Sequence, residues 1–464
     1  MCKISFYGKK LQHLSTCSWQ STCFVISCFF HNFLQLMNPF WIQVFYFVFL
    51  SFQGFWVLKV LRPRTEFRPR NIDLFFTSVS ATTVSSMSTV EMEVFSNEQL
   101  IVMTTLMFIG GEIFTSMVEL HLKRSKIKTT WKTEGKAATV DPNDSVDQIQ
   151  LSIDPVSDFR AHPFEPQNYV SSPYYNMILN YNSIKFLGFV VLGYLLVIQI
   201  LGVASVSVYL ALFSSAKDVL RNKGIDALTF AVFTIVSTFV SCGFVPTNEN
   251  MIVFSKNSGL LWILIPQILL GNTLFPSCLR FLIWVLGKKI KKAEAKYLLK
   301  NTTKVGYLHL LPRLHSSLLI ATVLGFILTG FILFCSLDWN SAGLSGLNTY
   351  QKVVGILFET VNARHTGETI VDLSTIAPAI LVFFVVMMYL PPYTSFLPVM
   401  EDEQSPLECE GTKRRRKWIA KNLIFSQLSF LVIFIILLCI TERMSFKEDP
   451  INFSVLNIVI EVIR

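Results

Sequence analysis

The feature that most constrains this chain is an order of segments that recurs along it: an apolar run, a polar loop, a second apolar run and a basic stretch. The first apolar run, 39–60, is long enough to cross a hydrocarbon core of about 30 Å as a helix. The loop at 74–93 is rich in Ser and Thr and too polar to do so. A segment that dips into a membrane must line a water-filled or protein-walled cavity, because lipid cannot satisfy bare backbone groups. The loop therefore predicts a pore loop that lines an ion pathway, with a Ser/Thr-rich extracellular connector as the alternative.

The same order divides the chain into repeated units. The first unit spans 38–122, with apolar runs at 39–60 and 99–122. The second spans 181–287, with runs at 186–213 and 258–286 around a loop at 226–247. The third spans 314–398, with runs at 316–337 and 376–397 around a loop at 350–372, and a fourth begins at 418 and reaches residue 464. Internal repetition of this kind is typical of membrane transport folds.

Basic stretches follow the second apolar run of each complete unit, and this places them together on one side of a membrane. They lie in the segments 123–180, 288–313 and 399–417. By the positive-inside rule these segments face the cytosol, and the loops face the other side. Segment 123–180 is interpreted as a largely disordered cytosolic linker, and 1–37 as a cytosolic or interfacial N-terminal segment. The sequence predicts an all-α, multi-pass protein with a cytosolic N-terminus, embedded in the lipid bilayer.

Composition excludes several other classes of protein. Hydrophobic residues make up 52% of the chain and charged residues 15%, against about 25% charged in a soluble domain. The net charge of +9 lies mostly in the basic blocks, so it does not indicate nucleic-acid binding. The nine cysteines are scattered, without a Cys-x-x-Cys pair, and support neither a disulfide framework nor a zinc site. No nucleophile–base pair or phosphate-binding loop is present, so we expect no enzyme and no cofactor.

When the three loop sequences are superposed, each has a small residue at the same position. The segments 80–86, 237–243 and 361–367 end on Ser86, Gly243 and Gly367. Glycine can take a positive φ and bring its carbonyl to a narrow axis, whereas Ser86 would narrow the constriction and add a hydroxyl. These three residues are the candidate ion selectivity filter. The alternative is a set of tight turns at the ends of short helices, where glycine is common.

Acidic residues follow each loop and could concentrate cations at an outer mouth. This candidate set is Glu91, Glu93, Glu249, Glu368 and Asp372. The alternative for each is a solvated surface position or a helix cap. Arg364 and His365 are interpreted as packing residues of the third loop, because no further metal ligands have suitable spacing. Glu112 lies within an apolar run and is a functional candidate, or a partner for the preceding loop at a helix end.

From about residue 38 to 464 the chain resembles plant HKT-type transporters of the Trk/Ktr/HKT superfamily. The stretches that carry the resemblance are F-F-T-S-V-S-A-T-T-V-S-S-M-S-T-V-E-M-E-V-F-S, F-I-G-G-E-I-F-T-S, S-C-G-F-V-P-T-N-E-N-M, G-N-T-L-F-P-S-C-L-R, N-A-R-H-T-G-E and M-M-Y-L-P-P-Y-T-S-F-L-P. The resemblance implies four helix–pore-loop–helix units around a pseudo-fourfold central pore, passage of Na⁺ or K⁺ across the plasma membrane, and a homodimer. Ser86 matches the Ser-type first filter position, which implies Na⁺ selectivity, and Gly243 and Gly367 match the next two.

The chain departs from the family pattern at its end. The fourth loop is expected to continue beyond Glu461 through a filter and a last span, but the sequence stops at Arg464. We therefore expect a fourth unit truncated before its filter. The first hypothesis is Na⁺-selective, channel-like uniport driven by the electrochemical gradient. The alternatives are a non-conducting form that partners with full-length copies, and Na⁺/K⁺ cotransport or K⁺ uptake, of which K⁺ uptake would need a glycine at position 86.

Overall fold

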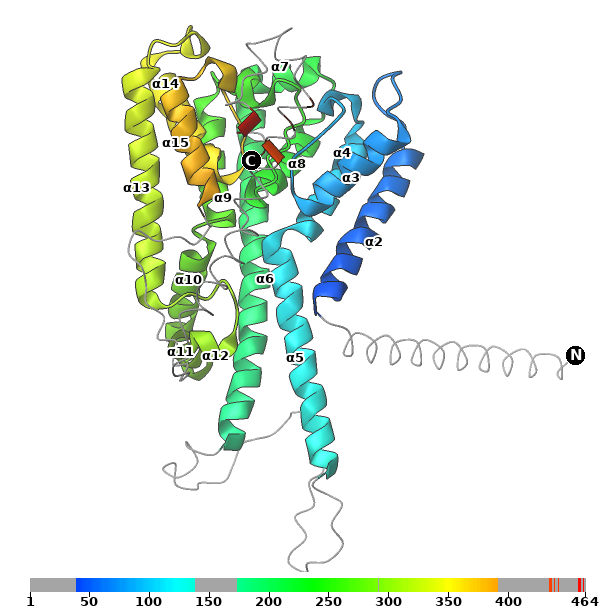
Figure 1. Ribbon diagram of the computed structural model, residues 1–464, viewed down its shortest axis with the longest axis vertical. Helices are drawn as coiled ribbons and strands as arrows, with labels where there is room; N and C mark the ends of the chain where they lie inside the picture. The colour runs from blue at the N-terminus through cyan, green and yellow to red at the C-terminus, as the bar shows by residue number, and fades with distance from the viewer. Residues whose placement is uncertain are drawn as a thin grey trace, which may run out of the picture.

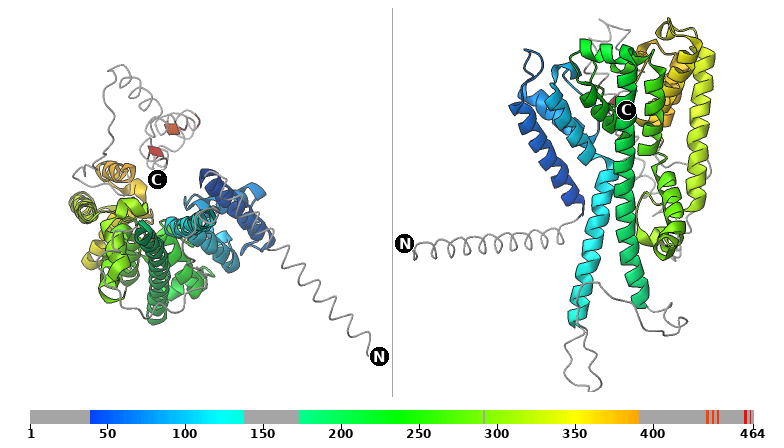
Figure 2. Two further views of the ribbon diagram at one scale, coloured as in Figure 1. Left: turned by 90° about the horizontal axis from the view of Figure 1, so that it is seen from below. Right: turned by 180° about the vertical axis from the view of Figure 1, so that it is seen from behind.

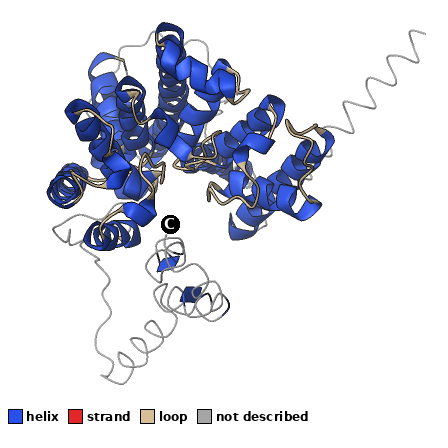
Figure 3. Cartoon of the chain, turned by 90° about the horizontal axis from the view of Figure 1, so that it is seen from above, coloured by secondary structure: helices blue, strands red, loops and turns tan. Residues whose placement is uncertain are grey.

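The computed structural model describes residues 39–137, 173–290 and 292–390, and a few positions between 434 and 462. All regular structure in these residues is helical (Figure 3), which confirms the predicted class. The segment 1–37, most of the fourth unit and the segment 399–417 lie outside the described residues. The α-helices are α2 (Pro39–Val60), α3 (Asn71–Thr83), α4 (Asn97–Gly110), α5 (Glu112–Ala137), α6 (Pro173–Leu212), α7 (Ser214–Asn222), α8 (Ala227–Phe239), α9 (Ser258–Gly271), α10 (Phe275–Lys289), α11 (Lys292–Lys300), α12 (Thr302–Val305), α13 (Arg313–Leu337), α14 (Thr349–His365) and α15 (Pro378–Tyr389).

Three units with the same order of elements follow one another along the described chain. Each has a long helix (α2, α6 or α13), a short helix (α3, α8 or α14), a loop, a 3₁₀ turn and a second apolar helix (α4, α9 or α15). The three 3₁₀ turns are Met92–Val94, Asn250–Phe254 and Leu373–Thr375, and a fourth, Ala342–Leu344, precedes α14. The short helices lie in the upper part of Figure 1, and α11 and α12 lie below them, near the lower end of α13.

Membrane-spanning potential is concentrated in a few of these helices. α2, α6 and α13 are long and apolar enough to cross a bilayer by themselves. The pairs α4–α5 and α9–α10 also qualify when each is taken as one span, with bends of 50° and 80°. The described residues therefore contain three candidate spans, or up to five with the bent pairs. The apolar runs predicted at 99–122 and 258–286 correspond to these two bent pairs, and the sequence did not indicate the bends.

The bends have a steric cause. A Cβ on Gly110 would lie 1.9 Å from the carbonyl oxygen of Thr82, at the end of α3. A Cβ on Gly271 would lie equally close to the carbonyl oxygen of Phe239, the last residue of α8. Thr82 and Phe239 occupy the same position in the superposed loops, so the same contact occurs in two units. Only glycine fits where a second helix is bent against the end of its own short helix.

The predicted linker 123–180 is helical at both of its ends. α5 continues to Ala137 and α6 begins at Pro173. α6 has 40 residues, which corresponds to about 60 Å at ~1.5 Å per residue and exceeds the hydrocarbon core. α5 and α6 pack side by side and extend together beyond the other helices (Figures 1 and 2). The prediction of a largely disordered linker is therefore wrong for 123–137 and 173–180, and its middle part, 138–172, lies outside the described residues.

Consecutive units are interlocked through their helices. In the first two units the second helix packs against the short helix of the next unit, α4 on α8 and α9 on α14. The contact of α4 with α8 buries Leu100, Met103 and Phe233 completely. In the view from below, the first unit in blue, the second in green and the third in yellow and orange follow one another across the molecule (Figure 2). This packing brings the three loops to one place.

Candidate functional site

The short helices begin with local caps and direct their carboxyl ends toward the loops. The amide N–H of Arg70 donates to Asp73 Oδ2 at 3.2 Å before α3, and the N–H of Thr229 donates to Asp226 Oδ2 at 3.0 Å in α8. The N–H of Asn348 donates to Gln351 Oε1 at 3.0 Å before α14. Helix carboxyl ends carry partial negative charge. Three such ends directed at one place favour a cation there.

The loops surround a cavity of about 230 Å³. Its lining includes residues 84–87 of the first loop, 241–242 of the second and 363–369 of the third. Ser86 and Gly367, two of the predicted filter residues, line it directly. Gly243 is buried beside it, and a Cβ at this position would lie 1.9 Å from the carbonyl oxygen of Thr366. The structure thus brings the three predicted positions together from segments far apart in the sequence.

The three predicted filter positions share a backbone conformation that is rare for residues with side chains. The φ angles are +79° at Gly243, +75° at Gly367 and +55° at Ser86. Glycine adopts this left-handed region readily, whereas an L-residue is strained there by about 1–2 kcal/mol. Strained residues cluster at functional sites when the surroundings hold them in place. Ser86 therefore takes a glycine-like backbone while it keeps its hydroxymethyl group.

Ser80, in the last turns of α3, holds the strained backbone of Ser86 in place. The Ser80 hydroxyl oxygen accepts the amide N–H of Met87 at 2.8 Å and the hydroxyl of Ser85 at 3.0 Å. These bonds hold the residues on both sides of Ser86. Sequence reasoning did not single out Ser80, although a hydroxyl residue near the carboxyl end of a short helix was visible in the loop pattern.

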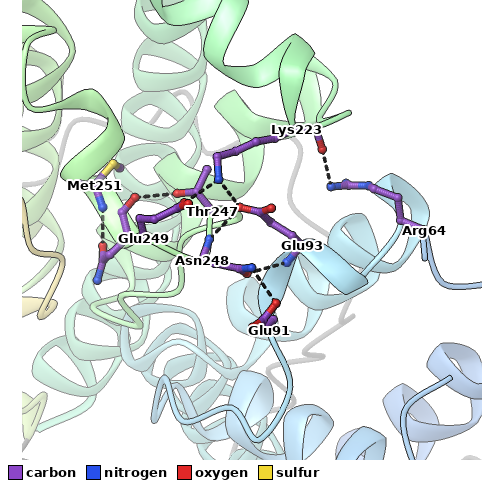
Figure 4. A network of polar contacts seen from close by, with 9 residues as sticks. Arg64, Glu91, Glu93, Lys223, Thr247, Asn248, Glu249 and Met251 are labelled. Atoms are coloured by element: carbon purple, nitrogen blue, oxygen red, sulfur yellow. Dashed lines mark hydrogen bonds and ion pairs between the residues drawn. The ribbon is translucent and has the colours of Figure 1, made fainter. Parts of the chain in front are cut away.

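Glu91, Glu93, Asn248 and Glu249 lie near or after the ends of the first two loops, and Lys223 lies at the end of α7. Together these five residues form a polar network that we call the mouth cluster (Figure 4). Lys223 Nζ lies 2.5 Å from Glu93 Oε1 and 2.5 Å from Glu249 Oε2. The Asn248 side chain donates to Glu91 Oε2 at 2.8 Å, and its backbone N–H donates to Glu93 Oε1 at 3.0 Å. Three of the five predicted acidic residues are therefore gathered in one place, with a lysine between two of them.

Charge pairing in the mouth cluster shifts two pKa values. The hydrogen bond from Lys223 holds the pKa of Glu249 below its usual range. Partial burial of Lys223 would lower its pKa, but the bonds to Glu249 and Glu93 outweigh this and the pKa is raised. Both groups therefore carry charge at neutral pH. The sequence offered no signal for Lys223, because its contact with Glu93 joins positions 130 residues apart.

The other two predicted acidic residues lie in different surroundings. Glu368 is fully buried, and its Oε1 accepts the hydroxyl of Thr238 at 2.6 Å, so the expectation of a place in an open mouth is corrected. Since Glu368 directly follows Gly367, the close contact between the second and third loops covers it. Asp372 is exposed, as expected for a mouth residue. A further buried carboxylate, Glu359 of α14, accepts the N–H of Ile370 at 3.0 Å and was missed from sequence.

The remaining polar candidates take part in packing. His365 is buried, with Nδ1 2.7 Å from the carbonyl oxygen of Val361, and the guanidinium of Arg364 lies 5.4 Å from the ring centre of Phe326. Both agree with the interpretation as packing residues. Glu112 begins α5 at the first bend and lies 3.8 Å from Nε2 of His309. Within the described residues, no group of three or more His, Cys, Asp or Glu side chains is placed to hold a metal ion.

Comparison with known proteins agrees with a pathway for cations. The family model TrkH, described as a cation transport protein, matches residues 178–397. The sodium transporter HKT1 of Arabidopsis thaliana is 49% identical over 88% of this chain and 78% of its own length. The cation transporter HKT1;3 of Oryza sativa subsp. japonica is 44% identical over 93% of this chain and 80% of its own length. Among solved structures, the potassium transporter TrkH from Vibrio parahaemolyticus aligns with a TM-score of 0.41 and 15% identity, over 76% of this chain and 56% of that one.

This chain is all-helical in its described residues, has candidate membrane spans and repeated loops around one cavity, and matches the TrkH model. It is therefore a cation transport protein and not an enzyme. The chain belongs to the plant HKT family of cation transporters. Members of this family transport Na⁺ or K⁺, and this chain is an HKT-type transporter for these cations.

Proposed function

We propose that this protein is a Na⁺-selective, passive uniporter of the plasma membrane. Four helix–pore-loop–helix units would surround a central pore with pseudo-fourfold symmetry. Ser86, Gly243 and Gly367 would form part of its selectivity filter. The observation that carries this proposal is the left-handed backbone shared by the three residues around one cavity, with φ of +55°, +79° and +75°.

Selectivity for Na⁺ would arise from the side chain of Ser86. A glycine leaves only its carbonyl oxygen at the narrow axis, whereas Ser86 adds a hydroxyl and a methylene group at the same backbone position. The extra bulk and oxygen would favour the smaller ion, since filters discriminate by the size of the site and by the number of coordinating oxygens. The relative that is 49% identical is named a sodium transporter, which supports the choice of ion.

The direction of transport would be set by the gradient and the membrane potential. The sequence contains no phosphate-binding loop that would couple transport to a nucleotide. The membrane potential supplies about 2.3 kcal/mol per charge per 100 mV. With the basic stretches in the cytosol, the mouth cluster and Asp372 would lie outside, where exposed carboxylates raise the local concentration of cations.

Two-electrode voltage clamp on oocytes that express the chain tests this proposal, with surface expression measured in parallel. External Na⁺ is replaced stepwise by K⁺, and the reversal potential is recorded. We expect currents whose reversal potential follows external Na⁺ and changes little with K⁺. A current that requires both ions would indicate cotransport, and one that follows K⁺ would contradict Na⁺ selectivity. Absence of current despite good surface expression would identify a non-conducting form.

A further inference from the structure

The bend between α9 and α10 contacts two pore loops at once. Gly271 packs against the carbonyl oxygen of Phe239, so the bend is held directly against the end of α8. The next two residues, Asn272 and Thr273, lie in the bend between the two helices. Each of them forms a side-chain hydrogen bond to a different loop.

Asn272 bonds to the second loop. Its Nδ2 donates to the hydroxyl oxygen of Ser241 at 2.7 Å. Ser241 lines the cavity and has a φ of +61°, two residues before Gly243. The strained backbone that leads into Gly243 is therefore held from the bend, in the way that Ser80 holds the first loop from its own helix.

Thr273 bonds to the third loop. Its hydroxyl lies 3.0 Å from Nε2 of His365, whose Nδ1 lies against the carbonyl oxygen of Val361 at 2.7 Å. Because a carbonyl can only accept, Nδ1 carries a proton, and in the neutral ring Nε2 is an acceptor for the Thr273 hydroxyl. The same hydroxyl lies 3.1 Å from Oδ1 of Asn272, so its one proton is shared between these two acceptors. Both side chains are buried, with 1% of Thr273 and 7% of His365 exposed. Water therefore cannot easily replace this bond.

The two loops held in this way also touch each other at the filter. Gly243 packs so closely on Thr366 that a Cβ would lie 1.9 Å from the Thr366 carbonyl oxygen, and Gly367 follows at once. In the first unit the two positions after the equivalent glycine are Gly111, which has no side chain, and Glu112, whose side chain is 68% exposed. The pair of side-chain hydrogen bonds to two loops is thus a feature of the α9–α10 bend and not of the α4–α5 bend.

We propose that Asn272 and Thr273 are positioning residues that set the distance between the second and third pore loops, and thereby the discrimination between Na⁺ and K⁺. This inference rests on the proposed function. Removal of either side-chain bond leaves a loop free to widen by a fraction of an ångström. Such a change favours the larger ion, because discrimination depends on the arrangement of the coordinating oxygens.

The test is the Na⁺/K⁺ permeability ratio, taken from reversal potentials under bi-ionic conditions. Thr273→Val keeps the shape but removes the hydroxyl, Asn272→Ala removes the amide, and Thr273→Ser restores the hydroxyl. We expect the first two to lower the ratio by about twofold or more, the range for loss of a coupled contact, and Thr273→Ser to keep it. The ratio does not depend on the number of molecules at the surface, so a folding defect alone does not change it.

Thr104→Val is the matched control, because the buried Thr104 hydroxyl bonds only within its own helix, to the carbonyl oxygen of Leu100 at 2.8 Å. It should leave the ratio unchanged. Equal ratios in Thr273→Val, Asn272→Ala and the wild type would overturn the inference while Na⁺ transport stood.

Ion binding gives a second measurement that does not depend on current. Purified protein is unfolded by heat in equal concentrations of NaCl or KCl, since an ion that binds the native state stabilises it. We expect greater stabilisation by Na⁺ in the wild type and in Thr104→Val, and a smaller difference in Thr273→Val. If no variant conducts, the proposed uniport fails and this comparison alone decides the inference. An unchanged difference in Thr273→Val overturns it.

Discussion

Ser86 combines a backbone conformation that favours glycine with a side chain that glycine lacks. Its φ of +55° lies in the region where Gly243 and Gly367 are also found. The strain is of the order of 1–2 kcal/mol and is offset locally by the bonds of Ser80 to both neighbours of Ser86. A serine in this position has a chemical reason to be there, which is the oxygen and the bulk that it adds beside the cavity.

Replacement of Ser86 by glycine should raise K⁺ permeability relative to Na⁺. The variant removes the hydroxymethyl group and leaves the backbone conformation accessible without strain, so surface expression should not fall. Ser86→Ala separates the two contributions, because alanine keeps the Cβ but not the hydroxyl. Reversal potentials in Na⁺ and K⁺ measure the effect. An unchanged ratio in Ser86→Gly would exclude this residue as the selectivity determinant.

Gly243→Ala should reduce stability and transport much more than Gly346→Ala, although the two substitutions have the same cost in backbone strain. Gly243 and Gly346 have φ of +79° and +78°, but a Cβ on Gly346 meets nothing within 4 Å, whereas on Gly243 it meets Thr366. We expect Gly346→Ala to cost about 1–2 kcal/mol from backbone strain alone. Gly243→Ala should cost more and abolish transport. Thermal unfolding of the two purified variants makes the comparison, and equal losses would contradict the close contact.

At the scale of elements, the sequence located the helices well and their bends poorly. The apolar run predicted at 39–60 coincides with α2 at both ends, because length and apolar character suffice to define a simple span. The runs at 99–122 and 258–286 gave no sign of the bends, since their apolar character continues through both of them. At each bend a glycine lies against the backbone of Thr82 or Phe239, and these partners, 28 and 32 residues away, cannot be identified from the apolar pattern.

The same limit applies to the candidate site. The meeting of Ser86, Gly243 and Gly367 at one cavity could be predicted because each loop repeats a similar local pattern. Lys223 could not, because its role depends on contacts with Glu93 and Glu249 from separate segments. The burial of Glu368 was also missed, because an acidic residue after a loop usually indicates solvent and only the packing of the third loop against Thr238 covers it.

Gly110→Ala and Gly271→Ala should both disrupt folding to a similar degree. In each, the new methyl group would meet a backbone carbonyl that cannot move without displacing a short helix. Gly193→Ala in α6 is the control, since its Cβ meets nothing within 4 Å and alanine favours a helix by about 0.5–1 kcal/mol. Surface expression and thermal stability in detergent report the outcome. Normal folding of Gly110→Ala would show that the first bend tolerates more space than the structure allows.

At the scale of the whole molecule, charged residues join segments that are distant in sequence. Arg64, in the basic stretch between α2 and α3, donates to the carbonyl oxygen of Lys223 at 3.1 Å and to Asn97 Oδ1 at 3.1 Å. The Lys223 side chain then reaches the first and second units together (Figure 4). Arg64 therefore holds the segment before α3 against the end of α7 and the start of α4.

Lys223→Gln should weaken the link between the first two units by about 1 kcal/mol, the usual scale of a partly exposed ion pair. The lowered pKa of Glu249 contributes stability above its unfolded pKa of about 4.3, and this is lost as pH falls through the folded value. The raised pKa of Lys223 contributes stability below about pH 10.4, which is lost at higher pH. The difference in melting temperature between wild type and variant should therefore be constant from about pH 5 to 10. Lys217→Gln, at an exposed position of α7, the helix that ends just before Lys223, is the control. A difference that varies near neutral pH would contradict this assignment.

The interlocked packing of the units has a consequence for how the protein is made. Since α4 packs on α8 and α9 packs on α14, each unit is completed by a helix that the ribosome synthesises later. A nascent chain that has inserted only its first unit therefore exposes a surface of α4 whose partner has not yet been translated. The exposed surface of each such intermediate must therefore be protected during insertion. A substitution that disrupts α8 would first destabilise the preceding unit, because α4 would lose its packing partner.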